Sequence, residues 1–439
     1  MKQPDPELVQ IEKPIYGGAF LARIQGKAVF VPLTLPGEQA RIRIVEDKRG
    51  YASAEALEIV APAPERVAPA CRHFGACGGC DYQHASYEAQ LRFKQSILRE
   101  TLERGGVRAP EEIAVLSAEP WAWRNRIRLA FDAQGNPGYR GHRSHAVIPI
   151  AECPIAAPLL VRAAQAIAEI ARKSPPLLRP SEISLFCDAQ ETALLAGLYT
   201  LSPAKIPLED FCRALAEKIP QLKGVEYTSE GRSGRPLRTV ARWGAASLDY
   251  HAAGFAYRVD HGAFFQVNRW LVDELVDQVT TNQRGALAWD LFAGVGLFAR
   301  QLASSFTRVV AVESAPTATA ALAHNLSGTS ATAVNANTLD FLRRTQRPGK
   351  NGPKNGSENE SDRPDLIVVD PPRTGLGAET TTLLAHVAAP ALVYVSCDPA
   401  TLARDLRPLI ASGYAIEKIT LADLFPQTFH LETIVRLRR

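Results

Sequence analysis

The sequence predicts an α/β protein in which a doubly wound domain follows a small β-barrel and an α+β central domain. Strand-like and helix-like segments alternate from about residue 260 to the end, the pattern of a doubly wound parallel sheet. Short β-prone runs separated by turns occupy the beginning, and the stretch between mixes both kinds of segment. We therefore expect domains at residues 1–62, 63–262 and 263–439.

The composition is that of a globular protein with a mildly basic charge. The 439 residues include 50 Lys and Arg against 46 Asp and Glu, a net charge of +4 that permits a nucleic-acid partner without requiring one. No apolar run approaches the ~20 residues of a membrane helix, and the opening MKQPDPELVQ lacks the apolar core of a secretion signal. We expect a cytoplasmic monomer that does not associate with membranes.

The first domain shows the spacing of a small OB-like barrel. Its clearest β-prone runs are residues 28–32, 40–45 and 54–60, with turn signals at Gly17-Gly18 and Pro36-Gly37. Barrels of this size often bind RNA, but a purely structural barrel fits the pattern equally well.

A cysteine cluster opens the second domain. Three cysteines fall within ten residues in CRHFGACGGC, and a fourth stands beside a proline in ECPIA. In a reducing compartment such a cluster favours a metal site over disulfides, and four thiolates suit zinc or an iron–sulfur cluster. The Gly78-Gly79 pair, which lets backbone amides approach inorganic sulfide, favours [4Fe–4S], while zinc stays open. The candidate ligands are Cys71, Cys77, Cys80 and Cys153.

The rest of the second domain contains a basic stretch with interleaved aromatic residues. If WRNRIRLAF is a strand, Arg124, Arg126 and Arg128 share one face, because side chains alternate along a strand. Guanidinium groups match phosphate and aromatic rings stack on bases, so an RNA-contacting edge is indicated, with a solvated charged face as the alternative. The segment GRSGRPLRTVARW could extend this surface through Arg232, Arg235, Arg238 and Arg242. An amphipathic helix at 88–104 is expected to be scaffold, and Cys187 and Cys212 are expected to be core residues.

In the third domain the expected strands are residues 286–292, 308–313, 331–335, 365–370, 391–396 and 416–421. Between the third and fourth of these strands, residues 347–363 have no apolar residue except prolines and should form a mobile surface insertion.

Several of these strands end in residues that suit a nucleotide cofactor and covalent chemistry. The first runs into DLFAGVG, where Gly294 and Gly296 let a ligand approach a helix N-terminus, and Glu313 suits a ribose diol. These residues leave a nicotinamide and an adenosylmethionine cofactor open. Further strands end at Asp370 and at Cys397, which taken alone could be an inert buried cysteine. A thiol and a carboxylate are unnecessary in a dehydrogenase but are needed to methylate an unreactive carbon.

The motifs CxxxxxCGGC, FFQVN, DLFAGVG, DPPRTG, VSCDPATLARD and FPQTFHLE together resemble the RNA uracil-C5 methyltransferase family over essentially the whole chain. The resemblance is to the branch with a TRAM barrel and a [4Fe–4S] cluster, whose members modify large-subunit ribosomal RNA. It implies a Rossmann-like class I methyltransferase domain, an RNA substrate and S-adenosylmethionine as methyl donor. It implies Cys397 as nucleophile and Glu432 as base. The cofactor contacts it implies are Gln266, Phe292, Glu313, Asn337 and Asp370.

Two positions depart from the family pattern. Asp398 stands where the family often has Asn, and Leu297 where it often has a polar residue that bonds the cofactor.

The residue types fit a covalent route to methylated uracil. A thiolate added at C6 makes an enolate whose C5 can attack a methyl sulfonium. An ionised Glu432 is then expected to remove the C5 proton, since the pKa of a free Glu is about 4.3. The uracil must be unstacked, which predicts a single-stranded or looped target. The same chemistry on transfer RNA and a non-catalytic RNA-binding protein are the alternatives.

Overall fold

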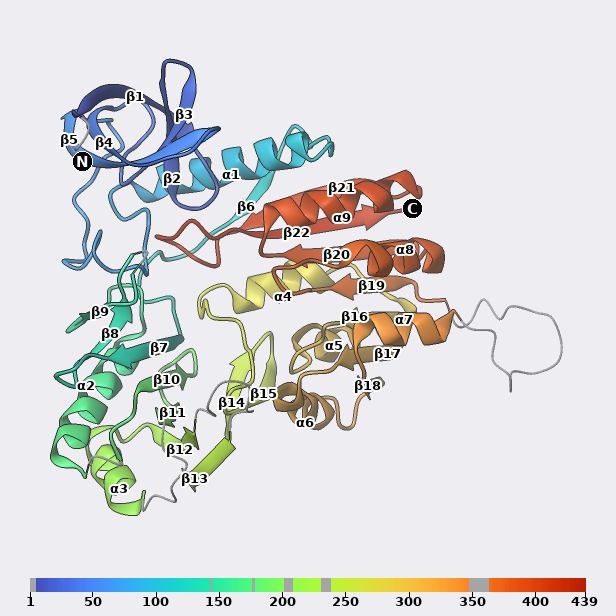
Figure 1. The fold of residues 1–439 in the computed structure, drawn as a ribbon. Coiled ribbons are helices and arrows are strands. Elements are labelled where there is room, and N and C mark those ends of the chain that lie inside the picture. The colour runs from blue at the N-terminus through green and yellow to red at the C-terminus, as the bar shows by residue number, and fades with distance from the viewer. Residues whose placement is uncertain (1–4, 143, 176–177, 201–207, 230–237, 347–362) are drawn as a thin grey trace.

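The computed structural model describes residues 5–142, 144–175, 178–200, 208–229, 238–346 and 363–439. Figure 1 shows a barrel at the N-terminus, a central part below it and a large C-terminal sheet beside both. The expected insertion, apart from Arg363, lies outside the described residues, as do Arg232 and Arg235. Among the described residues, no helix combines the length and apolar character needed to cross a lipid bilayer.

The N-terminal strands close into the predicted barrel, in the order β1-β2-β3-β5-β4. Buried residues alternate with exposed ones along β1, so that Val9 and Ile11 face the interior with Phe20 and Val29 from the next strands. The barrel strands are β1 Glu7–Pro14, β2 Ala19–Ile24, β3 Lys27–Pro32, β4 Gln39–Asp47 and β5 Tyr51–Ala61.

Helix α1 (Tyr87–Arg104) joins the barrel to the C-terminal domain. Phe93 packs into the barrel core, whereas Leu98 and Leu102 pack into the core beneath the C-terminal sheet. Strand β6 (Ala114–Leu116) then pairs in parallel with the edge of that sheet. The segment 87–116 therefore contributes to the core and the edge of the C-terminal sheet, although the sequence pattern placed it in the central domain. A three-residue strand has no periodicity that reveals its distant partner.

The central part is a sheet with two helices. Within the described residues seven strands run in the order β13-β12-β11-β10-β7-β8-β9. Helices α2 (Pro158–Lys173) and α3 (Glu209–Lys218) pack against it, and Cys187 and Cys212 lie in that core with no exposed surface, as predicted. The strands are β7 Arg126–Phe131, β8 Pro137–Arg140, β9 Val147–Pro149, β10 Glu182–Cys187, β11 Leu194–Thr200, β12 Leu222–Ser229 and β13 Arg238–Gly244. A hairpin of β14 (Ser247–Ala252) and β15 (Phe255–Asp260) leads onward.

The C-terminal sheet has the strand order β18-β17-β16-β19-β20-β22-β21-β6 among the described residues. The neighbours from β18 to β20 are parallel, as predicted, but β22 is antiparallel to both β20 and β21, so the sheet is mixed. The strands are β16 Gly285–Leu291, β17 Phe306–Glu313, β18 Ala331–Asn335, β19 Leu366–Val369, β20 Ala391–Ser396, β21 Ala415–Ala422 and β22 Glu432–Arg438. The helices are α4 Val272–Thr280, α5 Leu297–Leu302, α6 Pro316–Asn325, α7 Thr338–Thr345, α8 Gly377–Val387 and α9 Pro399–Ala411.

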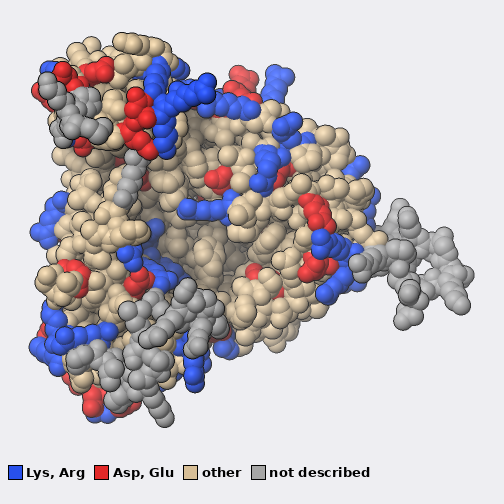
Figure 2. Space-filling view, viewed as in Figure 1, with Lys and Arg blue, Asp and Glu red and all other residues tan. Residues whose placement is uncertain are grey.

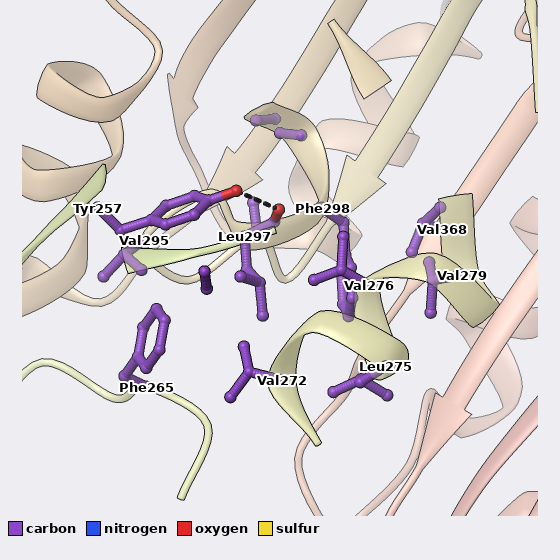
Figure 3. Close-up of a cluster of buried hydrophobic side chains, with 14 of the residues drawn as sticks. Tyr257, Phe265, Val272, Leu275, Val276, Val279, Val295, Leu297, Phe298 and Val368 are labelled. Atoms are coloured by element: carbon purple, nitrogen blue, oxygen red, sulfur yellow. Dashed lines mark hydrogen bonds between the residues drawn. The ribbon is translucent and has the colours of Figure 1, made fainter. Parts of the chain in front are cut away.

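An apolar cluster packs against the glycine turn on its core side. Figure 3 shows Tyr257, Phe265 and Val295 on one side and the side chains of α4 on the other, with Leu297 between them. The Tyr257 hydroxyl donates a hydrogen bond to the Leu297 carbonyl at 3.1 Å. The position at which the family often has a polar residue is thus a core position here, with Leu297 packed away from water.

Candidate active site

Strand pairing places Cys397 next to Glu432. Strands β20 and β22 are antiparallel, and their last paired residues are Ser396 and Thr433. Cys397 follows the first of these and Glu432 precedes the second, so the two residues stand opposite each other at the sheet edge. Residues opposite each other in such a pair have Cα atoms about 4.5–5.5 Å apart. The thiol and the carboxyl that the sequence singled out are therefore neighbours.

Asp370 joins this pair from the adjoining strand. Strand β19 is parallel to β20, with Val369 beside Tyr394, so both strands end at the same edge. Burial and the Asp370 charge raise the pKa of Glu432 well above its usual range, and burial likewise raises the pKa of Asp370. Glu432 is 6% exposed, and within the described part of the chain its Oε1 has no hydrogen-bond partner. The enclosure of two neighbouring carboxyls favours the protonated form of Glu432 relative to a solvated Glu, whereas the expected base must be ionised.

The Cys397 thiol is half-buried rather than enclosed. Burial, and after it the charges of Glu432 and Asp370, raise its pKa to about 12, while Arg373 acts in the opposite direction. The next residue, Asp398, caps α9: its Oδ1 accepts hydrogen bonds from the backbone of Ala400 at 3.0 Å and Thr401 at 2.9 Å. An Asp meets this capping role as well as an Asn does, so the departure from the family pattern has a structural explanation.

The glycine turn forms an open cradle at the same edge of the sheet. A side chain added at Gly294 would meet no atom within 4 Å, and the backbone N–H of Gly294 donates to Glu313 Oε2 at 2.9 Å. Phe292 takes a positive φ of 68°, a conformation that bends the chain sharply after β16. These features leave room for a ligand against the backbone and set a carboxylate beside it.

Two further predicted cofactor contacts have defined places. Asn337 follows β18 and caps α7, where its Oδ1 accepts from the Leu339 backbone at 2.9 Å. Gln266 is 8% exposed, and its carbonyl accepts from Asn125 Nδ2 at 2.9 Å, which ties this segment to the central domain. Glu313, Asn337 and Asp370 thus share the edge on which the glycine turn opens.

Asp290 is a buried acid that the sequence analysis passed over. It is the second-last residue of β16 and is fully buried. Its Oδ2 accepts from the Ala299 backbone at 2.8 Å, while its Oδ1 has no partner among the described residues. Burial raises its pKa to about 7, and the charges of Asp370 and Glu313 act in the same direction. The signal in the sequence is an acid near the end of an apolar strand, four residues before the first glycine of the turn.

The loop before β22 is held by the segment that follows the cysteine cluster. The backbone N–H groups of Asp81 and Tyr82 both donate to the Gln427 carbonyl, at 2.9 and 3.0 Å. Asp81 Oδ2 in turn accepts from the Phe429 backbone at 3.2 Å. The segment that carries His430 and Glu432 is therefore fixed by residues remote in sequence.

The barrel also reaches this site through Tyr16, in the turn between β1 and β2. Its ring meets the ring of Phe429 edge-on, with centroids 5.5 Å apart and planes at 86°. Burial and then the nearby Asp398 carboxylate raise the pKa of Tyr16. No sequence signal identifies this residue, since its neighbours lie hundreds of positions away.

The four clustered cysteines line one small cavity together with Arg124 and Tyr139. Gln83 Nε2 donates to Cys80 Sγ at 3.2 Å, and the Tyr139 hydroxyl lies 3.9 Å from Cys153 Sγ. Among the described residues, no group of three or more His, Cys, Asp or Glu side chains is arranged to hold a single metal ion. The predicted ligands are brought together, but not into a single-ion geometry.

The arginines of the predicted RNA edge divide between two places. Arg124 lines the cysteine cavity, whereas Arg126 and Arg128 line a larger cavity at the junction with the C-terminal domain. Arg242 joins the second group.

Known proteins share this arrangement over its whole length. Residues 7–57 match the TRAM domain family, and residues 242–439 match the tRNA (Uracil-5-)-methyltransferase family. A 23S rRNA (uracil(1939)-C(5))-methyltransferase from Chromohalobacter salexigens is 33% identical, over 98% of this chain and 89% of the relative. An uncharacterized RNA methyltransferase from Streptomyces avermitilis is 32% identical, over 98% of this chain and 97% of the relative.

A solved structure shows the same fold. The Pyrococcus abyssi tRNA (uracil-54, C5)-methyltransferase, in complex with S-adenosyl-L-homocysteine, superposes with a TM-score of 0.76 at 22% identity and covers 98% of this chain and 100% of its own. These relatives match the barrel, the C-terminal sheet and the edge that carries Cys397 in one continuous alignment. The chain therefore belongs to the RNA uracil-C5 methyltransferase family.

Proposed function

We propose that this protein methylates C5 of a specific uridine in 23S ribosomal RNA, with Cys397 as nucleophile and Glu432 as base. The observation that supports the residue assignment is the pairing of β20 with β22, in which the thiol and the carboxyl come from positions opposite each other at the end of the two strands. The choice of ribosomal RNA is supported by the 33% identity to the Chromohalobacter enzyme over nearly the whole chain. A transfer RNA substrate is the second candidate, favoured by the family description and by the Pyrococcus fold relative.

S-adenosylmethionine supplies the electrophilic methyl group when it is bound. The open cradle at Gly294 and the partnerless Oδ1 of Asp290 fit a ligand with hydrogen-bond donors at this edge. Glu313, Gln266, Phe292, Asn337 and Asp370 would hold it. A carboxylate at the end of the second strand suits the ribose hydroxyls, and the remaining residues would place the methyl group over the substrate base.

Cys397 would attack C6 of the flipped uracil after losing its proton. Formation of the S–C6 bond moves electron density through the ring to C5, which then takes the methyl group. The half-buried setting lets a base approach the sulfur from the cleft. Arg373 is the positive group that favours the thiolate against the two nearby carboxyls.

Glu432 would then remove the proton left on C5, and the electrons of that C–H bond would expel the sulfur from C6. Burial and the Asp370 charge raise the pKa of Glu432, so Glu432 must be ionised when the substrate is bound before it can act as the base.

We also propose a [4Fe–4S] cluster held by Cys71, Cys77, Cys80 and Cys153. The support is that these four thiols line one cavity and that Gln83 donates a hydrogen bond to Cys80, as second-shell donors do around cluster sulfurs. In this proposal the cluster is structural, because the segment directly after Cys80 holds the loop of Glu432. We further propose that the protein acts as a cytoplasmic monomer, which is consistent with all proposed site residues coming from one chain.

The test is to map 5-methyluridine by mass spectrometry in 23S ribosomal RNA and transfer RNA from cells with and without the gene. Loss of one ribosomal position, restored by the wild-type gene but not by Cys397→Ala, is expected. Cys212→Ala, at a buried core cysteine far from the site, serves as the matched control and should restore it. Loss at a transfer RNA position would select the second candidate, and unchanged RNA would favour a non-catalytic RNA-binding role.

A further inference from the structure

A cavity of about 590 Å³ lies where the central sheet meets the C-terminal domain. Its walls come from β7, β10, β11, β12 and β13 on one side and from β15 and the start of α6 on the other. Figure 2 shows the surface hollowed between the barrel, the central part and the C-terminal domain, with Lys and Arg side chains at the edge of this hollow. We call the cavity of about 590 Å³ the arginine cavity, after the lining residues Arg126, Arg128, Arg242 and Arg258.

Three of these arginines have carboxylate partners. Arg128 pairs with Glu182, Arg242 with Glu226 and Arg258 with Asp260, each at 2.7 Å. Such pairs hold the guanidinium groups in place and neutralise much of their charge.

Arg126 differs from the other three. Among the residues that the structure describes it has no ion pair, and its Nε is enclosed without a hydrogen-bond partner. Its guanidinium carbon stands 4.2 Å from the centre of the Phe186 ring, which supports it from one side. Burial lowers the pKa of Arg126 to about 10, so that it still carries its charge at neutral pH.

The enclosed guanidinium of Arg126 costs free energy while no carboxylate among the described residues pairs with it, and an anion bound in the cavity would lower that cost. A guanidinium fork presents the geometry that a phosphate group accepts.

The arginine cavity is separate from the proposed catalytic site but near one of its proposed cofactor contacts, Gln266, along the chain. Its lining includes neither the glycine turn nor Asp370, Cys397 or Glu432. Gly262, in its wall, is four residues from Gln266, so the chain between them spans at most about 14 Å. An RNA strand with its target base in the cleft could therefore place a neighbouring phosphate in the cavity.

We propose that the arginine cavity binds one backbone phosphate of the RNA substrate, with Arg126 as its principal contact. This rests on the proposed function in that the substrate is RNA. The cavity then acts as a second anchor that sets which nucleotide enters the cleft.

The test compares two proteins that both carry Cys397→Ala, one with Arg126 and one with Arg126→Gln. No cofactor is added, so that only RNA binding is measured. The probe is a fluorescein-labelled single-stranded RNA that carries the mapped uridine, followed by anisotropy over a salt series. Arg126→Gln should weaken binding about tenfold and reduce the slope of log affinity against log salt by about 0.7, the value for one lost phosphate contact. Arg126→Lys should restore the slope but not the full affinity, because it keeps the charge without the fork.

The matched control is Arg213→Gln, which removes an exposed, ion-paired arginine on α3 outside the cavity. It should leave affinity and slope unchanged. Calorimetry with S-adenosylmethionine on the Arg126→Gln variant should give the wild-type affinity, which separates an RNA phosphate from the carboxylate of the cofactor. Calorimetry with inorganic phosphate should show no binding to the wild type; binding that Arg126→Gln abolishes, with an unchanged RNA slope, would mean a free-phosphate site and overturn the proposal.

A measurement on the wild-type chain covers the case in which Arg126→Gln does not fold. Neutral methylphosphonate linkages placed singly around the uridine should weaken binding strongly at one linkage, and that effect should shrink in Arg126→Lys. If every linkage behaves alike, the cavity does not hold a phosphate. Failure of the proposed function would give a different result. The RNA would still bind through Arg126, but the wild-type protein with Cys397 intact and cofactor present would transfer no methyl group to it.

Discussion

Lys94 in α1 and Asp423, in the loop before β22, form an ion pair with an Nζ–Oδ1 distance of 2.6 Å and with neither side chain exposed. Tyr87 donates to the other oxygen of Asp423 at 2.9 Å, and Lys94 also donates to the Phe425 carbonyl. The pair links the helix that follows the cysteine cluster to the loop that leads into β22, whose first residue is Glu432. It therefore joins two proposed functional regions through one buried contact.

Breaking this pair should destabilise the protein strongly. Lys94→Met leaves the Asp423 carboxylate buried without its partner, and we expect a loss of roughly 3–5 kcal/mol in the free energy of unfolding. The double variant Lys94→Met/Asp423→Asn should recover most of that loss, because no uncompensated charge remains. Urea denaturation of Lys94→Met, Asp423→Asn and the double variant measures the coupling free energy between the two side chains. Lys173→Met, at an exposed pair with Glu169, is the control and should change stability by less than about 1 kcal/mol.

Glu432→Gln should trap the covalent complex. A neutral amide of the same shape cannot remove the C5 proton, so the S–C6 bond should persist after methyl transfer and turnover should fall by about 100-fold or more. A protein–RNA band that survives a denaturing gel, and that contains a methylated uridine, is the measurement. Glu417→Gln, at an exposed acid on β21, should turn over normally and give no such band. Free RNA alone with Glu432→Gln would contradict the assignment of the base.

The reactivity of Cys397 should rise with pH well beyond neutrality. Its pKa is raised to about 12, so the thiolate fraction grows about tenfold per pH unit from pH 7 to 10, where an ordinary thiol with a pKa of about 8.5 would level off. Iodoacetamide labelling, followed on the Cys397 peptide by mass spectrometry, gives the profile.

Asp370→Asn provides the matched variant for this profile. It removes a negative charge that raises the pKa of Cys397, so labelling should be faster at each pH. Glu417→Gln should leave the profile unchanged. A plateau below pH 9 in the wild type would show that the thiol is not shielded as the structure indicates.

The cysteine cavity should yield a coloured protein when purified without air. A [4Fe–4S] cluster gives broad visible absorption and iron in the protein, and Cys153→Ser should lose both. Cys212→Ser, in the core of the central domain, should keep them. Colourless protein with one zinc per chain would replace the cluster with a zinc site.

The sequence alone determined the elements that local pattern encodes. The apolar run ending at Cys397, the glycine turn and the acid at Asp370 each mark the end of a strand, and a parallel sheet brings such ends to one edge by its topology. The barrel strands and the buried Cys187 and Cys212 followed in the same way from periodicity and spacing.

Only the tertiary structure decided what depends on residues distant in sequence. The antiparallel β22 set Glu432 opposite Cys397, and enclosure beside Asp370 raised the pKa of a carboxyl expected to be ionised. Tyr16 and Lys94 likewise carry no local signature, and the strand pattern that marked Arg126 did not reveal that it is enclosed against Phe186. Burial, charge proximity and strand register arise from the packing of segments up to hundreds of residues apart, and no window of sequence contains them.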